Sequence, residues 1–124
     1  MQEDLYELEL LLPKPPTLNT FYAGKHWTIR KRKKAEYSQF IQDALADFEF
    51  WTMETFSLDV RYNCNYDVDN AIICAKFVSD YLTAHGYVAK DTPAYFTSQR
   101  TSFDSSLPKN TFSVKITCRK VTFK

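Results

Sequence analysis

The sequence has 124 residues, of which 44% are hydrophobic and 16% aromatic, so it can bury one core and is too short for two full domains. Charged residues make up 25%, and only two glycines and five prolines occur, which excludes a disordered or low-complexity chain. The formal net charge of +1 excludes a strongly basic or acidic protein as a whole, although the charge is unevenly spread. We expect a single domain over residues 1–124.

Export and membrane insertion are not indicated by the sequence. The acidic start, residues 1–9, lacks a basic flank and an apolar centre, and no apolar run approaches the roughly 18 residues that span a bilayer. The cysteines are odd in number, lie in apolar stretches and have no CxxC spacing, which is typical of buried free thiols: Cys64, Cys74 and Cys118. We therefore expect a cytoplasmic protein without membrane contact.

The chain opens with a predicted strand and a loop. Residues 5–12 alternate between apolar and other side chains, which predicts a strand with one buried face, and three prolines at 13, 15 and 16 end it. Residues 17–32 show no clean periodicity and are predicted to form an extended loop. A loop of this length in so small a domain indicates a binding role.

Basic residues are concentrated at the start of the next predicted element, a helix over residues 33–50. Apolar residues at spacings of three and four predict this helix. Six of the 16 basic residues lie in one stretch: Lys25, Arg30, Lys31, Arg32, Lys33 and Lys34. Cations in a first turn oppose the helix dipole at about 0.3–1 kcal/mol each, so bound phosphate would relieve them. The alternative is a solvated charged face.

The remaining elements complete an α+β order. Residues 55–64 alternate as a strand, and a helix is expected from Asp69 or Asn70 to His85, where Gly86 ends it. This helix is apolar almost all round and is predicted to be buried centrally. The segment at residues 87–93 follows, and its apolar start predicts a short buried strand. Longer strands are predicted over 94–103 and 111–123, joined by residues 107–110. The outline predicts layers of helix on sheet.

Three polar residues share one side of the central helix. Asp69, Lys76 and Asp80 lie within roughly 20° of one direction, because each residue turns the helix by about 100°. One interpretation is structural, with Asp69 as a cap and Lys76 paired with Asp80. The other interpretation is a functional site.

The functional interpretation draws on two further carboxylates. Asp67 precedes Asp69 by two residues, and Asp91 lies in the segment that returns to the sheet. Oxygen ligands from a strand end, a helix start and a nearby loop suit a hard cation, so the sequence predicts a Mg²⁺ site, with Mn²⁺ as the alternative. Its predicted ligands are Asp67, Asp69, Asp80 and Asp91. Such an ion would activate water at a phosphodiester, and Lys76 would contact a phosphate or the leaving oxygen.

Other chemistries lack their motifs. His26 and His85 are the only histidines and have no partner at zinc-ligand spacing. The sequence contains no GxSxG and no glycine-rich phosphate loop. His85 is interpreted as a residue at a helix end, and His26 as part of the basic loop.

Taken together, these motifs resemble the RusA family of Holliday-junction resolvases. The matching stretches are Pro-Pro-Thr-Leu-Asn at 15–19, the basic stretch, Asp-Val-Asp-Asn at 67–70, Lys-Phe-Val-Ser-Asp-Tyr-Leu at 76–82, and Gly-Tyr-Val at 86–88 followed by Asp91. The resemblance covers most of the chain. The sequence differs from the family at Lys90, where the family has the first Asp of an Asp-Asp pair. The spacing from Asn70 to Lys76 is also longer than in the best-known members.

The resemblance implies a fold, an activity and site residues. The fold would be a small mixed sheet with two helices packed on it, and the activity would be metal-dependent cutting of four-way junctions and other branched DNA. Asp67, Asp69 and Asp91 would be catalytic metal-binding carboxylates, Asp80 a further acidic member, and Lys76 a catalytic or DNA-contacting lysine. Family members act as homodimers, which suits two symmetric cuts.

Three functions stay open from the sequence. The first is a divalent-metal endonuclease that acts on branched DNA, with Lys25, Lys76 and the basic residues at 30–34 as its DNA contacts. The second is a protein that binds branched DNA and has lost catalysis, for which Lys90 is the hint. The third is a structural or protein-interaction domain whose polar stripe only braces a helix.

Overall fold

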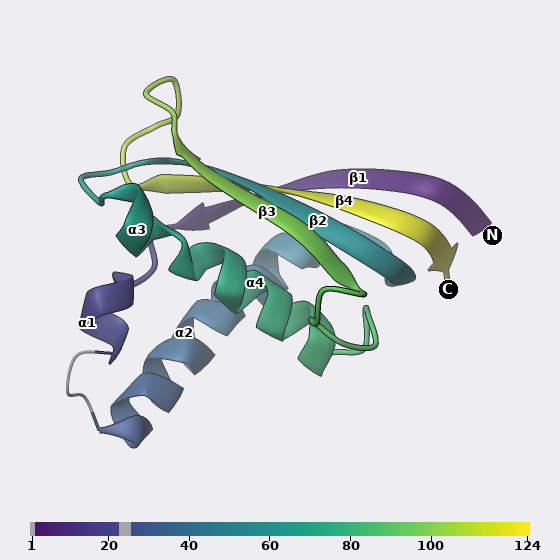
Figure 1. The fold of residues 1–124 in the computed structure, drawn as a ribbon, viewed down its shortest axis with the longest axis horizontal. Coiled ribbons are helices and arrows are strands. Elements are labelled where there is room, and N and C mark those ends of the chain that lie inside the picture. Colours follow the sequence, from purple (N-terminus) through teal and green to yellow (C-terminus); the bar gives the residue numbers. More distant parts are fainter. Residues whose placement is uncertain (1, 23–25) are drawn as a thin grey trace.

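A computed structural model describes residues 2–22 and 26–124 and has an α+β fold, a four-stranded mixed sheet with two main helices packed on one face (Figure 1). The elements are β1 (Gln2–Pro13), α1 (Leu18–Tyr22), α2 (Trp27–Leu45), β2 (Trp51–Asn63), α3 (Val68–Ala71), α4 (Ile73–Ala84), β3 (Phe96–Phe103) and β4 (Thr111–Phe123). The predicted order of strands and main helices is confirmed. The predicted loop at residues 17–32 is wrong, since it contains α1 and the start of α2.

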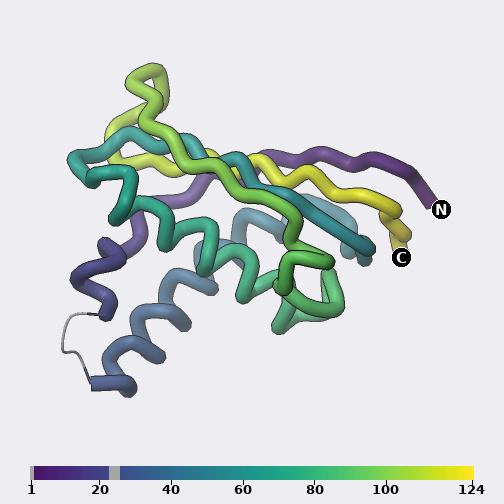
Figure 2. Tube along the Cα trace, in the orientation of Figure 1, coloured from purple at the N-terminus to yellow at the C-terminus, as the bar shows by residue number. Residues whose placement is uncertain are grey.

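The sheet has the order β1-β4-β2-β3. β4 pairs antiparallel with both β1 and β2, whereas β3 pairs parallel with β2 and so needs the helical crossover of α3 and α4. The two ends of the chain meet, because Gln2 of β1 pairs with Thr122 of β4 (Figure 2). Alternate residues of the central strands point to the helices and are fully buried, among them Val60 and Ile116.

α2 starts six residues before the predicted position. His26 occupies its N-cap, and its ring nitrogen Nδ1 accepts a hydrogen bond from the Thr28 amide at 3.3 Å. Histidine is an uncommon N-cap residue, and Trp27, Thr28 and Ile29 have modest helix propensity. Little in the sequence therefore indicates that a helix begins here. The first turn therefore holds Arg30 but not Lys33 or Lys34, and the expected opposition between several cations and the helix dipole is wrong.

The predicted central helix is divided in two. α3 and α4 are separated at Ile72, whose backbone stays near helical values at φ −61° and ψ −17°. Asp67, rather than Asp69 or Asn70, takes the N-cap position. The end is as predicted, because His85 is the C-cap and Gly86 adopts φ 82°, a left-handed conformation that glycine tolerates.

The segment after Gly86 forms no strand, which corrects the short strand predicted at the start of residues 87–93. It is still tied to the sheet, since the Met53 amide donates to the Tyr87 carbonyl at 2.9 Å and Val88 is buried. None of the helices in residues 2–22 and 26–124 combines the length and the apolar character that crossing a bilayer requires.

Phe77 of α4 connects three helices, α1, α2 and α4. Its ring, buried in the core, lies 5.1 Å from that of Phe21 on α1 and 5.4 Å from that of Tyr37 on α2, measured between centroids. Tyr37 in turn donates a hydrogen bond of 2.7 Å to the Pro13 carbonyl at the end of β1. These contacts fix α1 and α2 relative to α4.

Replacing Phe77 by alanine should lower the free energy of unfolding by about 3–5 kcal/mol, because a large buried ring is lost and a cavity remains. Urea denaturation followed by circular dichroism measures this. The matched control is Phe40→Ala on the exposed side of α2, where the ring is 50% exposed and the change should stay within about 0.5 kcal/mol. Equal losses in both variants would contradict the role given to Phe77.

The three cysteines are free, as predicted, but only two are buried. Burial raises the pKa of the Cys74 and Cys118 thiols to about 12, whereas Cys64 is half-buried. Because the thiolate is the reactive form, we expect one fast-reacting thiol in the native protein at about pH 8 and three after unfolding. Titration with a disulfide reagent, with Cys64→Ser as the control that abolishes the fast phase, measures this. Three fast thiols in the native protein would contradict it.

Candidate nucleic-acid interface

Asp80 of α4 lies between two lysines. Its Oδ2 is 2.7 Å from the Lys34 Nζ of α2 and 3.7 Å from the Lys76 Nζ of α4. The Asp80 side chain is only 17% exposed, whereas both lysines are about half exposed. The pair of Lys76 and Asp80 is the i, i+4 bridge that the structural interpretation expected, and Lys34 adds a link between the two main helices.

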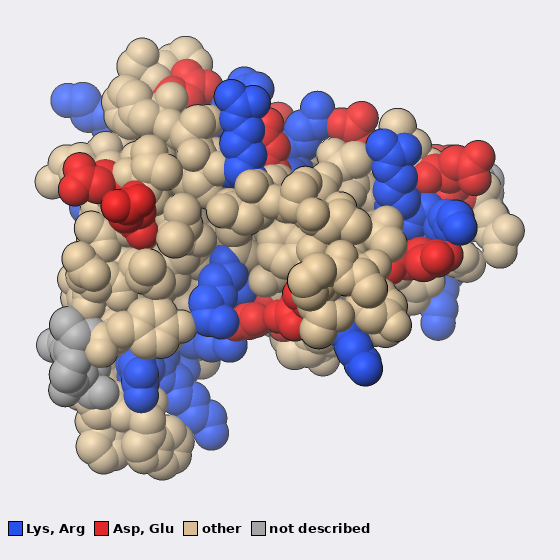
Figure 3. Space-filling model, in the orientation of Figure 1, with Lys and Arg blue, Asp and Glu red and all other residues tan. Residues whose placement is uncertain are grey.

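This ion-pair cluster forms part of a groove of about 360 Å³ between α1, α2 and α4. The groove is lined by Phe21, Tyr22, Arg30, Lys31, Lys34, Lys76, Phe77 and Asp80. Figure 3 shows Lys and Arg side chains gathered over the first half of α2 and across to α4. Four cations against one carboxylate leave the lining with a net charge of +3, which suits phosphate groups.

The groove unites four of the seven residues predicted to contact DNA: Arg30, Lys31, Lys34 and Lys76. Helical periodicity explains why only some basic residues of α2 line the groove, since positions 30, 31 and 34 share one side of the helix. Arg32 lies on another side, with its Nε 3.8 Å from Glu36 Oε1, and Lys33 also lies outside the groove lining. Lys25 lies outside the described residues.

Two of the predicted metal ligands lie at the start of α3. Asp67 is the N-cap residue, with an extended backbone at ψ 154°, and its side chain makes no capping hydrogen bond. Asp69 follows in the first turn, and both side chains are exposed. The local fold therefore presents two carboxylates to solvent, two residues apart.

The four predicted carboxylates do not meet in one chain. Among residues 2–22 and 26–124, no three His, Cys, Asp or Glu side chains are grouped so that they could hold a metal ion. Asp80 follows Asp69 by eleven residues, which is roughly 16 Å along a helix, and it is paired with lysines. Asp91 follows the opposite end of α4, in the segment that leads to β3 (Figure 1). The expectation of one four-carboxylate cluster is not met.

The structure does join two motifs that are far apart in sequence. The Asn19 amide of α1 donates a hydrogen bond of 3.1 Å to Asn70 Oδ1 on α3, across 51 residues. Tyr66 strengthens the junction, because its hydroxyl donates to the Pro15 carbonyl at 2.6 Å. The stretch at 15–19 thus packs against the stretch at 67–70, and α1 connects the groove to the two carboxylates on α3.

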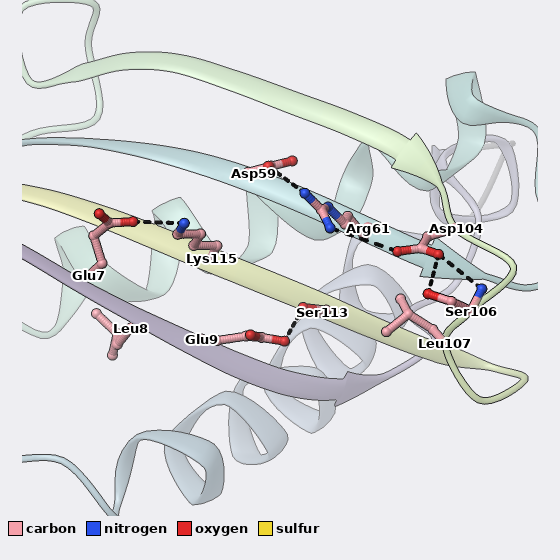
Figure 4. A pocket seen from close by; sticks show the side chains of 10 residues that line it. All are labelled: Glu7, Leu8, Glu9, Asp59, Arg61, Asp104, Ser106, Leu107, Ser113 and Lys115. Carbon is pink, nitrogen blue, oxygen red and sulfur yellow. Dashed lines mark hydrogen bonds and ion pairs between the residues drawn. The ribbon is translucent and has the colours of Figure 1, made fainter.

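A second groove, of about 440 Å³, lies on the sheet face that the helices leave open (Figure 4). Its two cations are already paired within the chain, and Glu9 accepts a hydrogen bond from Ser113. Lys115 Nζ lies 2.8 Å from Glu7 Oε2, and Arg61 lies 3.9 Å from both Asp59 and Asp104. Hydrogen bonds from Ser106 hold the pKa of the Asp104 carboxyl below its usual range, with a smaller contribution from Arg61.

The sign of this second groove makes it a poor DNA surface. Its lining has four carboxylates, Glu7, Glu9, Asp59 and Asp104, against two cations, which gives a net charge of −2. Phosphates would be repelled there, whereas they are attracted to the groove between the helices. The two faces of the domain are therefore electrostatically distinct.

Sequence reasoning missed two residues at the rim of the cationic groove. Tyr22 and Trp27 fall in the stretch that was predicted to be a loop, yet they end α1 and begin α2. A helix started at Trp27 would have placed Trp27 and Lys31 four residues apart on one side. That spacing was the available signal.

No protein-family model matches the chain, and no curated protein matches its sequence significantly.

Replacing Asp80 by asparagine should strengthen binding of duplex DNA, because Lys34 and Lys76 lose the carboxylate that competes with phosphate. The slope of log K against log salt should steepen by about 1, close to the 0.9 expected for each added phosphate contact. Fluorescence anisotropy over a series of salt concentrations measures both effects. The variant should stay folded, since asparagine has the shape of aspartate and the two lysines are about half exposed, so they stay in contact with water when the carboxylate is removed.

The matched control is Asp47→Asn, which makes the same charge change at an exposed position after α2. Its salt slope should equal that of the unmodified protein. Equal slopes in both variants would show that only overall charge matters and would contradict a specific role for the Lys34, Asp80 and Lys76 cluster.

Proposed function

We propose that this protein is a metal-dependent endonuclease that cuts branched DNA, similar to RusA-family Holliday-junction resolvases. The observation that carries the proposal is the cationic groove together with its link through α1 to the exposed Asp67 and Asp69. A nuclease needs positive charge to hold the backbone and carboxylates near the bond to be cut. This chain has both on one side of the sheet.

The start of α3 offers two carboxylate ligands for a metal ion, those of Asp67 and Asp69. Mg²⁺ commonly keeps several waters and binds one or two carboxylates together with substrate phosphates. Asp67 and Asp69 would supply those carboxylates, so a two-ligand site completed by DNA suits this chain better than a four-ligand site. Bound Mg²⁺ or Mn²⁺ would supply an activated water and stabilise charge on the phosphate.

The other groups of the proposed site act directly on DNA. Arg30, Lys31 and Lys34 would neutralise successive phosphates along the groove, since they share one side of α2. Lys76 would contact a phosphate nearer α3, in exchange for its 3.7 Å interaction with Asp80. Asp80 would then orient the two lysines rather than bind metal.

Two copies would act on a junction. A four-way junction is cut at two symmetric positions, so a homodimer places one active site at each. Within one chain Asp91 lies beyond the opposite end of α4 from Asp67 and Asp69, and Lys90 stands beside it. In this proposal the essential carboxylates of each copy are therefore the two on α3.

A second candidate function is binding of branched DNA without cleavage. It is favoured by the lack of a three-ligand metal group in the described part of the chain. The cationic groove would serve this function equally well. The two candidates differ in whether any metal supports phosphodiester hydrolysis.

Cleavage of an end-labelled four-way junction separates them. We expect paired symmetric nicks with Mg²⁺ or Mn²⁺ and none with EDTA. Asp69→Asn should reduce cleavage by about 100-fold or more, since removal of even an outer-shell partner of a metal ligand costs about 10–100-fold. Binding of the same junction in EDTA should be retained, because Asp69 is not part of the cationic groove.

Asp47→Asn serves again as the control for charge and should cut normally. Full cleavage by Asp69→Asn would refute the role of α3 in catalysis. Tight junction binding with no nicks in any metal would select the second candidate, and the absence of binding at low salt would exclude both.

A further inference from the structure

Two large aromatic rings are exposed, each beside a cation of the groove. Trp27 adjoins the lining without being part of it; it is 59% exposed, and Lys31 Nζ lies 5.9 Å from its ring centroid. Tyr22 belongs to the lining; it is 43% exposed, and the Arg30 guanidinium carbon lies 5.8 Å from its ring centroid. Both cations line the groove, so each ring adjoins a positive group of that lining.

Both rings stand on anchored supports. α1, which carries Tyr22, is held by Phe21, whose buried ring packs on Phe77, and by the bond from Asn19 to Asn70. Trp27 begins a 19-residue helix whose N-cap, His26, is hydrogen-bonded to Thr28. Rings on such supports are positioned before a ligand arrives, which lowers the entropy that binding must overcome.

Exposure alone does not single out these rings, since Phe40, Phe50 and Phe103 are exposed as well. Tyr22 and Trp27 differ in having a cation of the groove beside each ring. Trp51, the second tryptophan, is 0% exposed, and Phe77 and Tyr37 are buried in the core. An exposed aromatic surface beside cations matches a nucleic-acid strand with unpaired bases, because bases stack on the rings and phosphates meet the cations. Duplex DNA offers the phosphates but keeps its bases stacked in the helix.

We propose that Tyr22 and Trp27 stack on unpaired bases while Arg30, Lys31 and Lys34 hold the adjoining phosphates, so that the groove selects DNA whose bases are unstacked over plain duplex. The inference rests on the proposed function and names the feature of branched DNA that would be recognised, bases at the branch point that have lost a stacking neighbour. Tyr22 and Trp27 are then specificity-determining residues and take no part in hydrolysis.

Binding measured in EDTA tests the inference separately from cleavage. The full chain is titrated with a labelled oligothymidylate of about 12 nucleotides, within the usual site size for single strands, and with a duplex of equal length. We expect tighter binding of the single strand and quenching of tryptophan fluorescence. The quenching should come from Trp27, because Trp51 is buried, and it should vanish in Trp27→Ala.

Substitution of either ring should weaken the binding of single-stranded DNA. Trp27→Ala should weaken single-strand binding by roughly 5- to 100-fold and leave duplex binding nearly unchanged, whereas Trp27→Phe should retain much of the affinity. Phe40→Ala is the matched control, since its ring is 50% exposed on the same helix but is nine residues, roughly 13 Å, beyond Lys31 along α2. It should bind both DNAs normally. Tyr22→Ala should act in the same direction as Trp27→Ala.

Each other outcome overturns the inference in a recognisable way. Equal affinity of Trp27→Ala and the unmodified chain for single strands removes the stacking role but leaves junction cleavage standing. Tighter binding of an RNA of the same length, or of an acidic peptide, would assign the groove to a different ligand. No binding of any nucleic acid would remove both this inference and the proposed function.

Discussion

Burial of one sheet face beneath α2 and α4 is the constraint on which the remaining structure depends. The inward residues of β2 and β4, such as Val60 and Ile116, are completely buried, so both helices must pack on the same side. Phe77 then fixes the helices against each other and brings α1 to them through Phe21. Because the packed helices are held together on their apolar sides, Lys34 and Asp80 meet at 2.7 Å on the outer side. The groove is a consequence of the core.

The same arrangement separates charge between the two faces of the domain. The groove on the helix face has a lining of net +3, while the groove on the open sheet face has a lining of net −2 whose two cations are paired with carboxylates. A formal net charge of +1 conceals this difference. Because like charges repel and opposite charges attract over about 10 Å at ordinary salt, DNA would meet the domain from the helix side. Under the proposed function, the orientation of the domain on DNA would follow from the placement of a few side chains and not from total charge.

Most of the fold could be predicted because its elements have strong periodicity. β4 has the predicted bounds, 111–123, and the alternation from Phe112 to Cys118 corresponds to buried residues facing the helices. The stretch at 17–32 could not be predicted by the same means. α1 has five residues, too few for a helical pattern, and α2 begins at a histidine cap. Short helices held by tertiary contacts, such as that from Asn19 to Asn70, leave little local signal.

At the candidate site, the helical pattern predicted one contact correctly and another wrongly. Periodicity correctly placed Lys76 and Asp80 together, since they are one turn apart. It also gave Asp69 the same direction around one axis, but the predicted helix is divided at Ile72, so Asp69 on α3 and Asp80 on α4 do not share an axis. Only Asp67 and Asp69 are close in sequence as well as exposed at one place, the start of α3. A phosphate-binding cation needs few protein ligands when the substrate provides the others, so this pair, reached from the groove across α1, is where hydrolysis of a bound strand would be expected.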